Sequence, residues 1–311
     1  MIVYGPVPSR RLGRSIGINN IPPKNCSYSC IYCQVGITTK RISVRKEFYS
    51  TDDIVKQVEI KLNELYKKNE NVDYLSFVPD GEPTLDINLG KTIRKLRQFG
   101  IKIAVITNSS LLWDEIVRSD LSFADWVSVK VDTVINKDWI KVNHPAKGLV
   151  LNDILQGIKN FRKDYRSVLV TETMLVSGIN SNDDSLNETA KFISTLNAKN
   201  VYILVPIRPP AVKLEEANET IIKNALSIYF YYNNNVKLIN YNEGNNFSSF
   251  SNPIDELLSI LSVHPMRKDA ITEYFKNARL DEGELNNLIN TKKIKEISYN
   301  NTQFYKTNNE V

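Results

Sequence analysis

The stretch Cys26-Ser27-Tyr28-Ser29-Cys30-Ile31-Tyr32-Cys33 contains every cysteine of this 311-residue chain, in the pattern C-x3-C-x2-C. Three thiolates on one loop can hold three corners of a cubane iron–sulfur cluster and leave the fourth iron open to a small molecule. A structural zinc ion needs four nitrogen or sulfur ligands, and the chain adds only His144 and His264, both distant in sequence. The spacing therefore favours a reactive cluster. A zinc site, a redox-sensing site and three incidental cysteines are the alternatives.

Length and composition indicate a globular protein with one large domain and a small appendage. Hydrophobic residues make up 42% of the chain and charged residues 24%, which is enough apolar material for a sizeable core. No run approaches the about 18 apolar residues that cross a bilayer, and the first residues do not form a secretory signal. An odd number of clustered thiols favours a reducing compartment. We therefore expect a cytoplasmic protein that does not bind membranes.

Basic residues gather near the N-terminus, although the net charge of the whole chain is only +5. Residues 1–46 contain eight lysines and arginines and no acidic residue. Such a rim could steer a polyanion such as RNA toward the cysteine loop. It could equally offset the negative charge of a thiolate-ligated cluster.

Strand and helix patterns alternate after the cysteine loop and predict an α/β fold of six β/α units. Residues 5–13 are rich in turn formers and are expected to precede regular structure. The expected strands are 15–21, 72–78, 101–106, 126–131, 167–176, 201–205 and 236–239, and the expected helices are 50–68, 89–99, 111–119, 151–162, 183–197 and 214–232. The cysteines thus follow the first strand, at the end of a β/α barrel where active sites lie.

The cysteine loop, with the aromatic Tyr32 just before the third cysteine, resembles that of the radical SAM superfamily. The resemblance implies a partial (β/α)6 barrel and a [4Fe-4S] cluster held by Cys26, Cys30 and Cys33. S-adenosylmethionine would bind the open iron, and one electron would cleave it to methionine and a 5′-deoxyadenosyl radical. A ferredoxin or flavodoxin would supply that electron.

The resemblance also implies contacts to S-adenosylmethionine. Gly81-Glu82-Pro83-Thr84 after the second strand is similar to the superfamily's Gly-Gly-Glu region, which holds the amino group of the cofactor; an ordinary turn is the alternative. Thr107 and Asn108 would contact ribose or carboxylate, although this segment could instead cap a helix. The complete set of expected cofactor contacts is Tyr32, Gly81, Glu82, Pro83, Thr107, Asn108, Ser128, Glu172 and Val205.

Charged residues on two strands are further candidates. Ser128, Lys130 and Asp132 share one face of the fourth strand, since strand side chains alternate. Lys130 is the candidate catalytic residue, with an ion pair to Asp132 as its alternative. Glu172 lies in an apolar strand and needs a partner, because an unpaired buried carboxylate is costly. The cofactor, Arg166 or Lys130 could serve.

A composition change at residues 240–252, rich in asparagine, predicts a linker between a barrel domain over 1–239 and a small domain over 253–311. Three short helices and a hairpin at Asn300-Asn301 predict a winged-helix-like domain. Its third helix begins with the acidic run 281–284, which does not suit duplex DNA.

The wider pattern, including Pro8 to Gly13, is similar to a poorly characterised group related to wyosine-type tRNA-modifying enzymes and nitrogenase-cofactor assembly proteins. The wyosine enzyme uses a further cysteine-ligated cluster, for which this chain has no cysteines. We expect a radical SAM enzyme that modifies a substrate, with RNA or tRNA as the first candidate. Modification or activation of a protein or peptide and a non-catalytic redox sensor are the alternatives.

Overall fold

An eight-stranded sheet in the sequential order β1 to β8 forms the larger part of the molecule, in a computed structural model that describes residues 2–245, 247 and 252–308. All neighbours from β2 onward pair in parallel. These strands are β2 (Gly13–Ile18), β3 (Tyr74–Phe77), β4 (Lys102–Thr107), β5 (Trp126–Lys130), β6 (Val168–Met174), β7 (Asn200–Leu204) and β8 (Val236–Ile239). The sheet is curved and open, so the predicted partial β/α barrel is confirmed.

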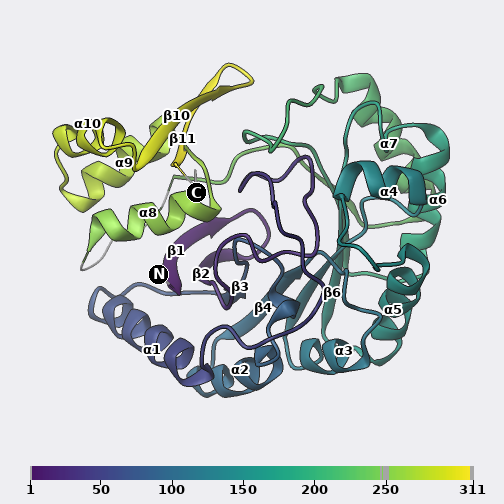
Figure 1. Cartoon of the computed structure of the whole chain (residues 1–311), viewed down its shortest axis with the longest axis horizontal. Coiled ribbons are helices and arrows are strands. Elements are labelled where there is room, and N and C mark those ends of the chain that lie inside the picture. Colours follow the sequence, from purple (N-terminus) through teal and green to yellow (C-terminus); the bar gives the residue numbers. More distant parts are fainter. Residues whose placement is uncertain (1, 246, 248–251, 309–311) are drawn as a thin grey trace.

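Helices cover the outer side of this sheet, as Figure 1 shows for α1, α2, α3, α5, α6 and α7. Within the described residues, none of the helices is long and apolar enough to cross a lipid bilayer. The helices of this part are α1 (Thr51–Lys67), α2 (Leu89–Leu96), α3 (Glu115–Leu121), α4 (Asn136–Asn143), α5 (Leu151–Asp164), α6 (Asp183–Ser194) and α7 (Glu219–Tyr232).

The first helix illustrates how local sequence sets these elements. Ser50 caps α1 by accepting a hydrogen bond from the Asp53 amide at 3.1 Å. Ile54, Val58 and Leu62 then recur on one face and are at most 2% exposed. The predicted helix over 50–68 is confirmed.

The N-terminal segment differs from the prediction. Residues 5–13 were expected to precede regular structure, but β1 (Val3–Ser9) is a strand that pairs antiparallel with β2. Its register shifts between Tyr4 and Val7. Because β1 is the edge of this sheet, Pro6 and Pro8 remove no ladder hydrogen bond that a central strand would need.

The C-terminal elements form a smaller unit beside the β1 edge (Figure 1). Tyr4 of β1 packs into its apolar core with Leu257, Ile260 and Tyr274. Its three-stranded sheet has the order β10-β11-β9. The elements are α8 (Pro253–Val263), β9 (Met266–Arg267), α9 (Lys268–Ala278), α10 (Glu282–Asn290), β10 (Ile294–Tyr299) and β11 (Thr302–Thr307).

The expected three helices and hairpin are therefore present in this unit, and the winged-helix assignment and the domain boundaries stay predictions. Residues 246 and 248–251 of the expected linker, and 309–311 of the expected small domain, lie outside the described residues.

Candidate functional site

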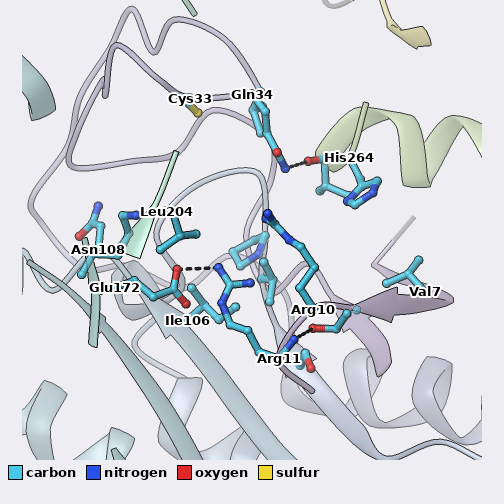
Figure 2. Close-up of a pocket in the computed structure, with 18 of the residues that line it drawn as sticks. Val7, Arg10, Arg11, Cys33, Gln34, Ile106, Asn108, Glu172, Leu204 and His264 are labelled. Carbon is cyan, nitrogen blue, oxygen red and sulfur yellow. Dashed lines mark hydrogen bonds and ion pairs between the residues drawn. The ribbon is translucent and has the colours of Figure 1, made fainter. Parts of the chain in front are cut away.

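A cavity of about 330 Å³ opens where the carboxyl ends of the parallel strands meet the cysteine loop. Figure 2 shows side chains from several strands and from the C-terminal unit around it. Cys26, Cys30 and Cys33 lie along one part of the wall, and Val263 and His264, from the end of α8, lie along another. Ligand sites of β/α barrels occur at this end of the strands.

Backbone hydrogen bonds fix the cysteine loop over this cavity. The amide of Ile31 donates to the Val142 carbonyl at 3.0 Å, and the Cys33 amide donates to the Cys30 carbonyl at 3.0 Å. The indole of Trp139 donates to the Tyr28 hydroxyl at 3.0 Å. Val142 and Trp139 belong to α4, so this helix, which lies where only a loop was expected, anchors the loop that carries the thiols.

The three thiols are free, and their surroundings suit metal-bound sulfur. Burial raises the pKa of Cys26 well above the ordinary thiol value and that of Cys30 to about 12. The side-chain amides of Asn108 and Asn143 lie 3.6 and 3.4 Å from the sulfurs of Cys26 and Cys30. Amide donors favour the thiolate, and a bound metal cation deprotonates a coordinating thiol outright. The donor set therefore fits an iron–sulfur cluster.

Within the described residues, no three His, Cys, Asp or Glu side chains converge as ligands of a single metal ion. A mononuclear site requires its ligands around one point. In a cubane cluster each thiolate binds a separate iron. The three cysteines border one common cavity.

Glu82 ties the loop after β3 to the cysteine loop and to the end of β4. Its carboxylate accepts hydrogen bonds from the hydroxyls of Thr84 and Thr107, both at 2.6 Å, and from the Asn108 amide at 2.6 Å. Burial nevertheless raises the pKa of Glu82, and these donors oppose the rise. One buried carboxylate thus orients the cavity-lining ends of two strands.

Gly81 is required by close packing of the chain on itself. A Cβ atom at this position would lie 1.9 Å from the carbonyl oxygen of Asn25, the residue before Cys26. The same carbonyl accepts a hydrogen bond from the Glu82 amide at 3.0 Å. Gly81 therefore lies in close contact with the backbone that leads into the cysteine loop.

Glu172 on β6 has the partner that its burial demands. It is 2% exposed, and its carboxylate lies 2.7 Å from a terminal nitrogen of Arg11. The Ser128 hydroxyl donates to it at 2.7 Å. Burial alone would raise the pKa of Glu172, but Arg11, Lys130 and Ser128 outweigh it and lower the pKa overall. The expected ion-pair partners were Arg166 and Lys130; the ion pair is formed by Arg11.

Lys130 at the end of β5 lines the cavity. The ion pair with Asp132, which was the alternative to a catalytic role, is also present. The ammonium nitrogen of Lys130 lies 3.7 Å from the Asp132 carboxylate and 5.0 Å from the centre of the Tyr32 ring. Tyr32 in turn donates a hydrogen bond to Asp132. A catalytic role for Lys130 stays a prediction.

Most of the predicted site residues lie around this one cavity. The lining includes Cys26, Cys30, Cys33, Tyr32, Gly81, Glu82, Thr107, Asn108, Lys130 and Glu172. Among the described residues, Pro83, Ser128 and Val205 do not line it. Pro83 opens the short 3-10 helix Pro83–Leu85, Ser128 lies behind Glu172, and Leu204 occupies the wall next to Val205. Cofactor contact by each proposed residue stays a prediction.

A second polar group in the cavity consists of Arg208, Arg10, Gln34, Glu243 and His264. The last four were not assigned to the site from the sequence. All five line the cavity. Glu243 lies in the segment expected to be a linker. Its partners Arg208 and His264 are 35 and 21 residues away in the sequence, so local sequence gives little signal for these contacts.

Comparison with known proteins identifies the fold and the family. Residues 20–193 match the model of the radical SAM superfamily, and the chain belongs to this superfamily. Its members are enzymes, so the non-catalytic sensor is set aside. The chain is also 46% identical over 310 residues to a UPF0026 protein of Methanocaldococcus jannaschii, covering 99% of this chain and 96% of that protein. Within the superfamily it is therefore a member of the UPF0026 group.

Two solved structures share the fold at low sequence identity. A radical SAM methyltransferase from Sphaerobacter thermophilus has a TM-score of 0.57 and 12% identity, with 73% of this chain and 66% of that chain covered. TYW1 with a lysine-pyruvate adduct bound has a TM-score of 0.53 and 15% identity, with 71% and 74% covered. These similarities support the barrel fold.

Proposed function

We propose that this protein is a radical SAM enzyme whose Cys26, Cys30 and Cys33 hold a [4Fe-4S] cluster and whose cavity binds S-adenosylmethionine beside it. The observation that carries the proposal is that the three free thiols border one cavity with the Glu82 and Glu172 networks. When bound, the cluster supplies one electron that breaks the bond between sulfur and C5′ of S-adenosylmethionine, giving methionine and a 5′-deoxyadenosyl radical.

The protein's own contribution is to bind and orient. Asn108 and Asn143 place amide donors next to two of the sulfurs. Glu82 fixes the Thr107 hydroxyl and the Asn108 backbone, which line the cavity on the side of Cys26. In this proposal, these groups hold the amino-acid part of S-adenosylmethionine.

On the opposite strands, Arg11 keeps Glu172 ionised, because it holds the pKa of that carboxyl low. Glu172 lines the cavity, and an ionised carboxylate accepts strong hydrogen bonds from hydroxyl groups such as those of ribose. Lys130, next to Asp132, is the proposed group that contacts the substrate. The electron donor in this proposal is a ferredoxin or flavodoxin.

RNA or tRNA is the substrate class that the sequence favoured, and it stays a prediction. Of the eight basic residues in 1–46, Arg10, Arg11, Arg14 and Arg45 form ion pairs with carboxylates. Fewer positive charges are thus left for phosphate contacts. An affinity for tRNA that falls steeply as the salt concentration rises would support an RNA substrate. An affinity for tRNA that does not depend on salt would favour a protein or peptide substrate.

The experiment that tests the proposal is product analysis with reconstituted, dithionite-reduced protein. Incubation with S-adenosylmethionine should yield 5′-deoxyadenosine and methionine in equal amounts. Cys30→Ser should yield neither product, whereas Thr39→Ser, at an exposed position that follows the same loop, is the control. An intact cluster that produces no 5′-deoxyadenosine would contradict the proposal.

A further inference from the structure

Two arginines and one glutamate form a charged wall of the cavity, defined here as Arg10, Arg208 and Glu243. Arg208 pairs with Glu243, and Arg10 lies 3.9 Å from the same carboxylate. The side chains are only 10%, 7% and 7% exposed. Two guanidinium groups therefore share a single carboxylate in a place where water is scarce.

The neighbours of this wall do not restore the charge balance. Gln34 is neutral; it accepts a hydrogen bond from Arg208 at 3.0 Å and donates to the Val263 carbonyl at 2.7 Å. His264 lies 2.7 Å from Glu243, and burial and Arg208 lower its pKa. A histidine adds no negative charge in either protonation state, so the two arginines and the one glutamate leave an excess of at least one positive charge.

Arg10 has the weakest partners of the three. Besides the long contact to Glu243, it donates to the Tyr241 carbonyl at 3.5 Å, the limit of a hydrogen bond. Burial and the two neighbouring arginines, Arg208 and Arg11, lower its pKa to about 9, and it remains protonated at neutral pH. Figure 2 shows its side chain extending into the cavity toward Gln34 and His264.

Arg208 also keeps an unused donor. Among the described residues, no hydrogen-bond partner is found for its buried Nε atom. A buried donor without a partner costs free energy, and a buried excess charge costs more. A ligand that removes both costs must accept hydrogen bonds and carry negative charge. Oxyanions have both properties, and guanidinium groups match the geometry of carboxylates and phosphates.

We propose that the charged wall binds an oxyanion of the substrate, a carboxylate or a phosphate, with Arg10 and Arg208 as its ligands. The inference rests on the proposed function, because it takes the same cavity to be the reaction site. It defines the chemistry of the substrate: the part of the substrate that enters this cavity carries an anionic group, and that group lies at the charged wall. The rest of the molecule then faces the cysteine loop.

Isothermal titration of the cluster-reconstituted full-length protein with inorganic phosphate, and separately with acetate, tests this site. Both titrations are made with saturating S-adenosylmethionine and at constant ionic strength set with chloride. The proposal predicts one site per chain, and the tighter of the two anions indicates which oxyanion the substrate carries. Binding of neither anion under these conditions overturns the proposal.

Variants locate the site. Arg10→Gln should weaken anion binding on the order of 10- to 100-fold, because it removes a charged hydrogen-bond donor. The anion affinity of Arg10→Lys should lie between that of Arg10→Gln and that of the original protein. Arg166→Gln removes an equal charge from an exposed position before β6, at the far ends of the strands, and should bind normally. Unchanged binding by a folded Arg10→Gln protein, or equal losses in Arg10→Gln and Arg166→Gln, would contradict the assignment.

The two proposals can fail separately. Formation of 5′-deoxyadenosine without anion binding would overturn only the oxyanion site. Anion binding without 5′-deoxyadenosine would overturn only the radical SAM function.

Discussion

The ion pair between Arg11 and Glu172 gives the most quantitative prediction, for the change Arg11→Gln. The carboxylate is 2% exposed and lies 2.7 Å from the guanidinium. Removing one partner of a buried ion pair costs about 3 to 5 kcal/mol, because the other charge is left uncompensated. At roughly 2 °C per kcal/mol for a chain of this size, the thermal midpoint should fall by about 6 to 10 °C.

The pH dependence of this loss has a defined sign. In the original protein the pKa of Glu172 is lowered, so the pair stabilises the fold above the unfolded pKa and the benefit disappears as the pH falls through the folded value. Without Arg11, burial dominates and the pKa of Glu172 rises. The deficit of Arg11→Gln should therefore be largest at neutral pH and should shrink as the pH is lowered.

Differential scanning calorimetry of the full-length protein under anaerobic conditions measures both effects. Adding Glu172→Gln to Arg11→Gln removes the stranded charge and should recover part of the midpoint, and Arg166→Gln serves as the surface control. A midpoint within about 2 °C of the original protein, a deficit independent of pH, or no recovery in the double variant would refute the reasoning.

Three further predictions concern single sites. Gly81→Ala should lower the iron content after reconstitution, because its Cβ would lie 1.9 Å from the Asn25 carbonyl and displace the cysteine loop; an unchanged iron content would contradict this. Gly157→Ala in α5 should lower the free energy of unfolding by about 1 to 3 kcal/mol, measured by chemical denaturation, since the new methyl group would meet the Leu112 backbone at 2.3 Å. If Gly157→Ala instead stabilised the protein, as helix propensity alone predicts, this reasoning would be contradicted. Burial raises the pKa of Asp80 to about 6, so the stabilising contribution of its protonated form is complete below the unfolded pKa and is lost as the pH rises through 6. The thermal midpoint of Asp80→Asn should therefore rise relative to that of the original protein between pH 5 and pH 7.5. A difference between the two midpoints that does not change with pH would contradict this.

Local sequence predicted the elements whose signals are short-range. Ser50 marks the start of α1, and apolar periodicity gives its buried face. The cysteine spacing and the Gly81-Glu82 pair predicted two groups that line one cavity. These features were accessible because cap residues, periodicity and ligand spacing act within a few residues.

Two elements were missed because their local signals conflict with the fold. β1 contains Pro6 and Pro8, which indicate a turn, yet an edge strand tolerates them. α4 is a short helix with few apolar positions, and packing of Trp139 on Tyr28 supplies the stability that its own sequence does not provide.

Long-range pairing was the other limit. Glu172 clearly needed a partner, but Arg11 is 161 residues away, and nothing in local sequence distinguishes it from Arg166. Glu243 lies in an asparagine-rich segment typical of a linker, and only the fold brings it to Arg10 and Arg208.

The central claim is that three thiolates hold a cubane cluster with one iron open to S-adenosylmethionine. Electron paramagnetic resonance of anaerobically purified, reduced protein, recorded before and after addition of S-adenosylmethionine, tests it most directly. We predict a [4Fe-4S] signal whose g-values change when S-adenosylmethionine binds. A mononuclear zinc ion in place of the cluster, or a cubane signal that S-adenosylmethionine leaves unchanged, would contradict the claim.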